Sequence, residues 1–250
     1  MKKFLVIFTV FSLFIISCKE KEKEEPIDSI TTNANIEGAV RLYNEFGEKV
    51  SNERMLVYLA GGSAYFYGET EKDGSFLILN ATYYPNYTIV YEKQGFGTYK
   101  KSNFSHEYTG SIGQISGTPN LGEKSSTRVS QFNVEMINDS LHLEVMLGSK
   151  NMNGERYIRF LFHTIPEISH DVFKFYTGRF TMNSNHHTLI LTKEYLEGLG
   201  LQSGVKYYVQ AYGASYYSNA YNDGNLSKIV LPNLGYSESV ATPKDDFIMP

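Results

Sequence analysis

The sequence has no tryptophan and a single cysteine, Cys18, among its 250 residues. One cysteine cannot form a disulfide within the chain, so the fold has to rest on hydrophobic cores and not on a disulfide framework. The length leaves room for one large domain or two ordinary ones, each able to bury its own core. The lone thiol therefore needs an explanation of its own.

Positive charge is not in excess either. The chain carries 23 Lys and Arg against 27 Asp and Glu, a formal net charge of −4, and it has no cluster of basic residues. Binding of nucleic acid needs Lys and Arg gathered on one face to neutralise phosphates. We predict no nucleic-acid partner.

Motifs for catalysis and metal binding are also lacking. There is no Gly-x-Ser-x-Gly elbow, and Gly110-Ser111-Ile112-Gly113 lacks its context. His186 and His187 would point to opposite faces of a strand, and no carboxylate or cysteine at ligand spacing joins them. The run Tyr221-Asn222-Asp223-Gly224-Asn225 lacks the carboxylates of a calcium loop and fits a hairpin turn. The sequence predicts a non-enzyme without metal or cofactor; a hydrolase built on a carboxylate pair is a less favoured alternative.

The first residues are typical of a signal peptide, assigned to residues 1–17. Met1-Lys2-Lys3 is basic, and the apolar run over residues 4–16 is too short to span a bilayer comfortably. Its end, Ile15-Ile16-Ser17-Cys18, resembles the lipobox of bacterial lipoproteins. This resemblance implies cleavage before Cys18, lipidation of that cysteine, and stable attachment to a membrane through two or three acyl chains. The alternative is an ordinary cleaved signal with an incidental cysteine.

Residues 18–34 are predicted to form a tether. The run Lys19-Glu20-Lys21-Glu22-Lys23-Glu24-Glu25-Pro26 contains no apolar residue and cannot bury enough surface to order itself. It resembles the surface-export signals of lipoproteins in Bacteroidota-type bacteria, which implies an outer-membrane protein that faces the cell surface. A spacer in the periplasm is the alternative.

The remaining chain predicts an all-β fold of two tandem sandwiches, because 20 Tyr and 16 Phe favour strands. For the first, residues 35–125, period-two alternation predicts strands at 36–42, 55–60, 64–70, 76–79 and 87–91. Lys72-Asp73-Gly74 predicts a tight turn with glycine at the left-handed position.

Four motifs in this region resemble those of the carboxypeptidase regulatory-like, transthyretin-like domains. They are G-x-V at Gly38-Ala39-Val40, T-x-x-D-G-x-F from Thr70 to Phe76, Y-x-I-x-Y from Tyr87 to Tyr91, and the pair Gly95-Phe96. Residues 82–86 depart from the family, which usually has Pro-Gly before the tyrosine strand. The resemblance implies a structural or binding module of β-sandwich fold without catalytic residues of its own.

The second sandwich is predicted over residues 126–250, after a polar linker at 120–127. Strands are expected at 129–136, 141–147, 157–163, 188–191, 205–212 and 228–231, and a short helix at 193–199 that ends at Gly200. His163, at the end of one such strand, is expected to be a hydrogen-bonded structural residue.

The run from Leu201 to Tyr212 resembles the L-x-P-x-T-x-Y-x-V-x-A signature of fibronectin type III domains. The resemblance implies a tyrosine corner at Tyr207, with its ring in the core and its hydroxyl bonded to backbone across the corner. Ser203 and Val205 replace the usual proline and threonine, and no early-strand tryptophan exists. An immunoglobulin-like sandwich is the broader prediction.

Tyrosines are concentrated between residues 207 and 221, where six of them occur. Some must face outward on any alternating strand, and exposed tyrosine suits stacking on a glycan or contact with a protein. Tyr216 and Tyr217, followed by Tyr212, are the predicted ligand-binding residues. The alternative is that these rings cover the rim of the core and the partner sheet.

The sequence therefore predicts a lipid-anchored protein of the cell envelope with modules for binding or adhesion. The ligand is expected to be a glycan, or a protein of the envelope or the host. An accessory subunit of an outer-membrane uptake or secretion complex is the alternative.

Overall fold

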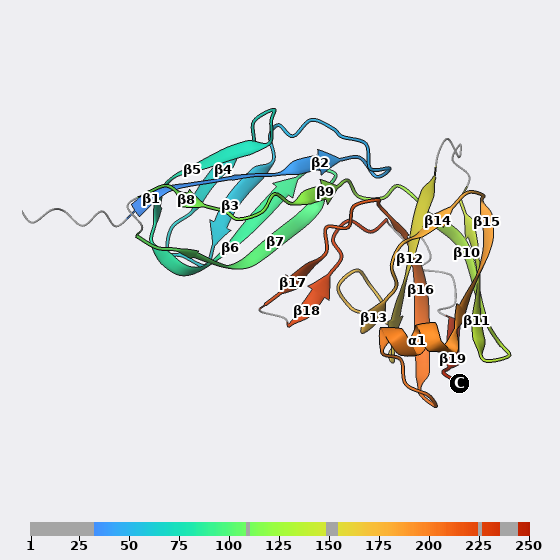
Figure 1. Cartoon of the computed structure of the whole chain (residues 1–250). Coiled ribbons are helices and arrows are strands. Elements are labelled where there is room, and N and C mark those ends of the chain that lie inside the picture. The colour runs from blue at the N-terminus through green and yellow to red at the C-terminus, as the bar shows by residue number, and fades with distance from the viewer. Residues whose placement is uncertain (1–32, 109–110, 149–154, 225–226, 236–244) are drawn as a thin grey trace, which may run out of the picture. The chain divides into compact units, whose positions relative to one another are not determined.

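The structure is a computed structural model that describes residues 33–108, 111–148, 155–224, 227–235 and 245–250. These residues belong to one compact unit, Thr32–Pro250. Over these described residues the fold is all-β with one short helix, α1 (Figure 1), as predicted. The predicted signal peptide, Cys18 and nearly all of the predicted tether lie outside the described residues. In the part of the chain that the structure covers, no helix is long and apolar enough to cross a membrane.

The described residues between 33 and 122 form nine strands. They are β1 Asn33–Ala39, β2 Arg41–Tyr43, β3 Leu56–Ala60, β4 Phe66–Glu69, β5 Ser75–Thr82, β6 Tyr84–Lys93, β7 Gly97–His106, β8 Gly113–Gln114 and β9 Asn120–Gly122. One sheet has the order β5-β1-β8, a second has the order β4-β3-β6-β7, and β2 pairs with β9 in parallel. The core between the sheets is apolar and includes Ile36, Val57, Ile78 and Tyr91.

The predicted strands of this region are all present, with shifted ends. β1 begins at Asn33, three residues before the predicted start. The predicted strand 36–42 is divided into β1 and β2 at Val40, whose N–H donates to the carbonyl of Gly74 (3.0 Å). The turn that supplies this carbonyl is confirmed, since Gly74 has φ 91° and the Glu71 N–H donates to the Ser75 carbonyl (2.8 Å).

The second group of elements follows in the described residues from 129 on. These are β10 Val129–Ile137, β11 Ser140–Leu147, β12 Arg156–His163, β13 Phe175–Tyr176, β14 Phe180–Met182, β15 His186–Thr192, α1 Lys193–Leu199, β16 Lys206–Ala214, β17 Tyr221–Asp223, β18 Lys228–Val230 and β19 Asp245–Ile248. One sheet has the order β10-β11-β15, and another has the order β13-β12-β16-β19 with β14 also paired to β12. Apolar residues of both sheets form one core, among them Leu143, Phe160, Phe162 and Val209.

The predicted strands and helix of this second group are present, but one strand lies elsewhere than expected. Residues 228–231 were expected to join the second sandwich, yet β18 pairs only with β17 in a two-stranded sheet. The hairpin predicted at Asp223 is thus confirmed. The helix is also confirmed: the Thr192 side chain accepts from the Tyr195 N–H at its start, and Gly200 ends it in the left-handed conformation.

Each group contains a tyrosine that bonds to backbone five residues earlier. In the second, the ring of Tyr207 is buried and its hydroxyl accepts from the Gln202 N–H (3.1 Å), as the tyrosine-corner prediction requires. In the first, the buried Tyr87 donates its hydroxyl proton to the carbonyl of Thr82 (3.1 Å), which the sequence analysis did not anticipate.

Loss of the Tyr207 hydroxyl is expected to lower the free energy of unfolding by about 1 kcal/mol, because the part-buried hydrogen bond from the Gln202 N–H is lost. Urea denaturation of Tyr207→Phe measures this, with Tyr67→Phe, on an exposed ring, as the control. Equal stability of both variants would mean that the corner bond has no net effect.

Two buried asparagines connect the two groups of elements. The Asn219 side chain donates to the carbonyls of Phe96 (2.7 Å) and Gly122 (2.8 Å) and accepts from the Gly122 N–H (2.8 Å). Asn233 accepts from the Asn219 N–H (3.1 Å) and donates to the carbonyl of Tyr217 (2.8 Å). We call Phe96, Gly122, Asn219 and Asn233 the junction. Each of these hydrogen bonds replaces a bond to water that the group loses when it is buried.

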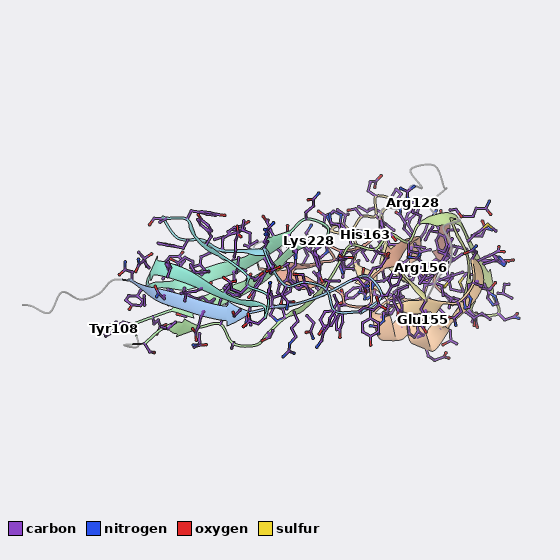
Figure 2. The ribbon with its side chains drawn as sticks, turned by 90° about the horizontal axis from the view of Figure 1, so that it is seen from above. Tyr108, Arg128, Glu155, Arg156, His163 and Lys228 are labelled. Carbon is purple, nitrogen blue, oxygen red and sulfur yellow. The ribbon has the colours of Figure 1, made fainter. Side chains whose placement is uncertain are left out.

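Two ion pairs also join the same two groups. Arg156 of β12, labelled in Figure 2, lies 3.3 Å from Glu45, and both side chains are nearly buried. Lys100 of β7 lies 3.3 Å from Asp223 of β17. The hairpin β17–β18 lies beside β7 (Figure 1), so residues late in the chain pack against the first group.

Candidate binding surface

The predicted ligand residue Tyr212 is buried in the structure. Its hydroxyl donates to the carbonyl of Ile168 (3.0 Å), and burial raises its pKa to about 12. The ring belongs to a small cluster with Leu161 and Leu231. Its hydroxyl is therefore already used within the fold.

Tyr216 and Tyr217, the other two predicted residues, lie close together, with ring centroids 4.9 Å apart. The Tyr217 ring packs on Tyr43 of β2 at 4.2 Å. The Tyr216 ring is 37% exposed, but the Arg179 guanidinium covers it at 4.2 Å and the Tyr157 ring meets it edge-on. Both rings therefore take part in contacts within the molecule, beside the junction.

A more exposed set of tyrosines lies on the sheet β4-β3-β6-β7. Tyr58 of β3 pairs in register with Tyr67 of β4, and Tyr65 precedes β4. The ring centroids of Tyr58 and Tyr65 are 5.4 Å apart, and those of Tyr65 and Tyr67 are 5.5 Å apart. Tyr65 is 60% exposed and Tyr67 is 57% exposed. We call these three residues the tyrosine surface.

Polar groups border the tyrosine surface. The Tyr58 hydroxyl donates to Glu92 of β6 (3.2 Å), and Thr98 of β7 donates to the same carboxylate oxygen (3.3 Å). Burial and the Glu92 charge raise the pKa of Tyr58. The Tyr58 hydroxyl therefore keeps its proton, and its hydrogen bond to Glu92 holds the ring in place. Its neighbours Tyr65 and Tyr67 are exposed to solvent.

Such a surface suits a ligand with flat apolar faces and hydroxyl groups. Aromatic rings supply apolar area at low conformational cost, and phenol hydroxyls and a carboxylate supply hydrogen bonds at the edge. The sequence contained a signal for it. Residues 65 and 67 share one face of the predicted strand 64–70, but the higher density of tyrosines favoured residues 207–221.

The histidines considered as metal ligands have other partners. His186 Nε2 lies 2.6 Å from Glu144, next to the hydrogen bond from Asn133 to that carboxylate. His163 accepts from the Ile165 N–H (3.1 Å), as expected of a structural residue, and burial lowers its pKa. Within the described ranges no group of three or more His, Cys, Asp or Glu could hold a metal ion.

An open depression of about 750 Å³ lies where β1, β4, β5 and β8 meet. Glu37, Glu69 and Glu71 contribute to its lining, together with the exposed Leu77. Gln114 donates to Glu37 across it. It contains no aromatic platform of exposed rings comparable with the tyrosine surface.

Comparison with protein-family models gives no match, and comparison with curated proteins gives none. Among solved structures, a candidate carbohydrate-binding protein from Bacteroides uniformis is similar over 81% of this chain and 95% of its own, with 13% identity and a TM-score of 0.30. DUF3823 family proteins from Parabacteroides merdae and Bacteroides ovatus are similar over 82% of this chain and 99% and 97% of their own. Their identities are 9% and 11%, and their TM-scores are 0.28 and 0.25. Scores this low carry no conclusion about a ligand.

Proposed function

We propose that this protein is a lipid-anchored binding protein of the cell envelope whose tyrosine surface recognises a glycan. The exposed, contiguous rings of Tyr65 and Tyr67, supported by Tyr58, carry the proposal. Aromatic side chains of this size normally contribute to a core, and a contiguous exposed apolar patch is characteristic of an interaction site. A pure spacer between anchor and partner needs no such patch.

The domain assignment is part of this proposal. The first sandwich is proposed as carboxypeptidase regulatory-like, supported by the turn at Gly74 within its T-x-x-D-G-x-F motif. The second is proposed as fibronectin type III-like, supported by the Tyr207 corner. Both resemblances are to modules that serve binding and display.

Anchoring is proposed at Cys18, with the modules facing outward from the outer membrane. The support is the lipobox-like sequence and the acidic-and-lysine run that follows it. Metabolic labelling with palmitate is expected to mark the native chain and not Cys18→Ser. Protease treatment of intact cells then tests the surface location: digestion supports it, and protection places the protein in the periplasm.

Loss of the two exposed rings is expected to abolish glycan binding. A glycan array probed with the chain lacking residues 1–31, which retains the whole compact unit, identifies the ligand. We expect Tyr65→Ala/Tyr67→Ala to weaken its binding at least tenfold, because each substitution removes a large apolar contact, and the related stacking of a nucleobase on an aromatic ring contributes about 1–3 kcal/mol.

The matched control is Tyr108→Ala, which removes a ring of similar exposure, 65%, outside the tyrosine surface. Tyr108 follows β7, and its ring meets that of Tyr83 (5.8 Å), which is not part of the tyrosine surface. Equal binding by the double variant and the control would place the site elsewhere, and Tyr216→Ala/Tyr217→Ala then becomes the next test. Absence of any glycan ligand would favour a protein ligand or the subunit of an envelope complex.

A further inference from the structure

A buried arginine, Arg159, lies in the middle of β12 without a carboxylate. The residue is 8% exposed, and its Nε has no hydrogen-bond partner. Its guanidinium lies 5.4 Å from the ring centroid of Tyr176 on β13. Buried charges in proteins are normally paired, since removal from water is costly. Three residues earlier on the same strand, Arg156 does have such a partner in Glu45.

The segment between β13 and β14, opposite Arg159, contains one extra residue, as in a β-bulge, and this brings a second arginine to it. Thr177 bonds to Phe160 through its backbone N–H, whereas Phe180 is the register partner of Ile158. One residue of β12, Arg159, therefore faces two residues, Gly178 and Arg179. Bulges of this kind redirect side chains and are frequent beside functional sites.

Arg159 and Arg179 lie on the same face of the sheet. Ile158, Phe160 and Phe180 point into the core, so the alternate residues point to the other face. The Arg179 guanidinium lies over the rings of Tyr157 (5.5 Å) and Tyr216 (4.2 Å). Like charges in neighbouring cross-strand positions destabilise a sheet. The Arg179 charge, after burial, contributes to lowering the pKa of Arg159.

Neither arginine has an acidic partner in the part of the chain that the structure describes. Arg179 donates to the carbonyl of Tyr216 (3.0 Å), which leaves its charge uncompensated. Gly178, the residue before Arg179, has open space where a side chain would start, because a Cβ added there would meet nothing within 4 Å. Tyr195 of α1 is 39% exposed; burial raises its pKa, and the positive charge of Arg159 opposes that rise.

We propose that Arg159 and Arg179 form a binding site for an oxyanion group, a carboxylate or a sulfate, bordered by the rings of Tyr176 and Tyr195. The planar guanidinium groups match the geometry of such an anion. The bound anion supplies the negative charge that the two arginines lack. This site is separate from the tyrosine surface and does not depend on the function proposed for it.

The test measures the binding of different probes to the chain lacking residues 1–31, at a constant ionic strength maintained with chloride. The probes are inorganic sulfate for a free anion, glucuronate for a carboxylate on a sugar, and glucose as its neutral counterpart. We expect saturable binding of sulfate or glucuronate by calorimetry. Any binding of glucose is expected to be the same in Arg179→Gln as in the native chain. Arg179→Gln is expected to weaken the anion affinity about tenfold or more, since hydrogen bonds to charged groups are the strong ones.

Sulfate stabilises proteins generally, so thermal shifts count only as differences between variants. Arg41→Gln, which removes an exposed positive charge on β2, is the control and should respond to anions like the native chain. Arg159→Met keeps the side-chain volume, and we expect it to fold and to lose the anion response. If Arg179→Gln binds sulfate and glucuronate as the native chain does, or if neither anion binds saturably to the native chain, the proposal is wrong.

Discussion

Replacement of Asn219 by alanine is expected to lower the free energy of unfolding by roughly 3 kcal/mol. The residue is fully buried, and its side chain makes three hydrogen bonds to the backbone of Phe96 and Gly122. Alanine leaves the Phe96 carbonyl and the Gly122 N–H without their partner, and it leaves the Gly122 carbonyl with only the longer bond from Asn233 (3.4 Å). An unsatisfied buried polar group costs about 1–3 kcal/mol, so these losses together justify a large effect.

Urea denaturation followed by tyrosine fluorescence measures this change. Asn222→Ala is the matched control, because Asn222 lies three residues later, on β17, and is exposed; its effect is expected within about 0.5 kcal/mol. A loss below 1 kcal/mol for Asn219→Ala would show that the junction opens readily to water, and the two groups of elements would then move independently.

Gly97→Ala is expected to be comparably damaging, at about 3 kcal/mol. The added Cβ would lie 2.5 Å from the carbonyl oxygen of Pro232, which follows β18. The residue also has φ 75°, a conformation that costs an alanine about 1 kcal/mol. The remainder comes from the backbone shift needed to relieve the overlap.

Gly95→Ala separates these two causes. Gly95 has φ 89°, and a Cβ there would meet nothing within 4 Å. This variant therefore reports the cost of the left-handed backbone alone, about 1 kcal/mol. The difference between the two variants measures the packing of residue 232 against β7. Identical effects would contradict the close approach of these segments.

Local features of this fold were readable from the sequence. The turn at Asp73-Gly74, the helix ended by Gly200 and the corner at Tyr207 each depend on residues within a few positions of one another. In β10, alternation predicted the strand but not which residues face the core along its whole length. A register shift between Val129 and Gln131 lets both Val129 and Phe132 face the core, which strict alternation does not allow.

Features that depend on distant pairs were not readable. Asn219 bonds to Gly122, 97 positions away in the sequence, and no sequence pattern near either residue indicates that contact. Arg159 appeared as one residue of a predicted strand, and only the register with β14 brings Arg179 to it. Tyr65 and Tyr67 could have been selected from their shared strand face. Tyr216 and Tyr217 were selected by density, which does not distinguish exposed rings from rings packed on Tyr43 and Arg179.

The position of β1 has a mechanical consequence for a protein attached at Cys18. β1 is the first described strand after the proposed anchor, and it lies between β5 and β8 in its sheet. If the proposed anchor and a ligand on β3 and β4 pulled along β1, the hydrogen bonds on both of its sides would share the load in shear and would not be broken one at a time. Under the proposed function, drag would then be resisted first by a strand that is paired on both sides.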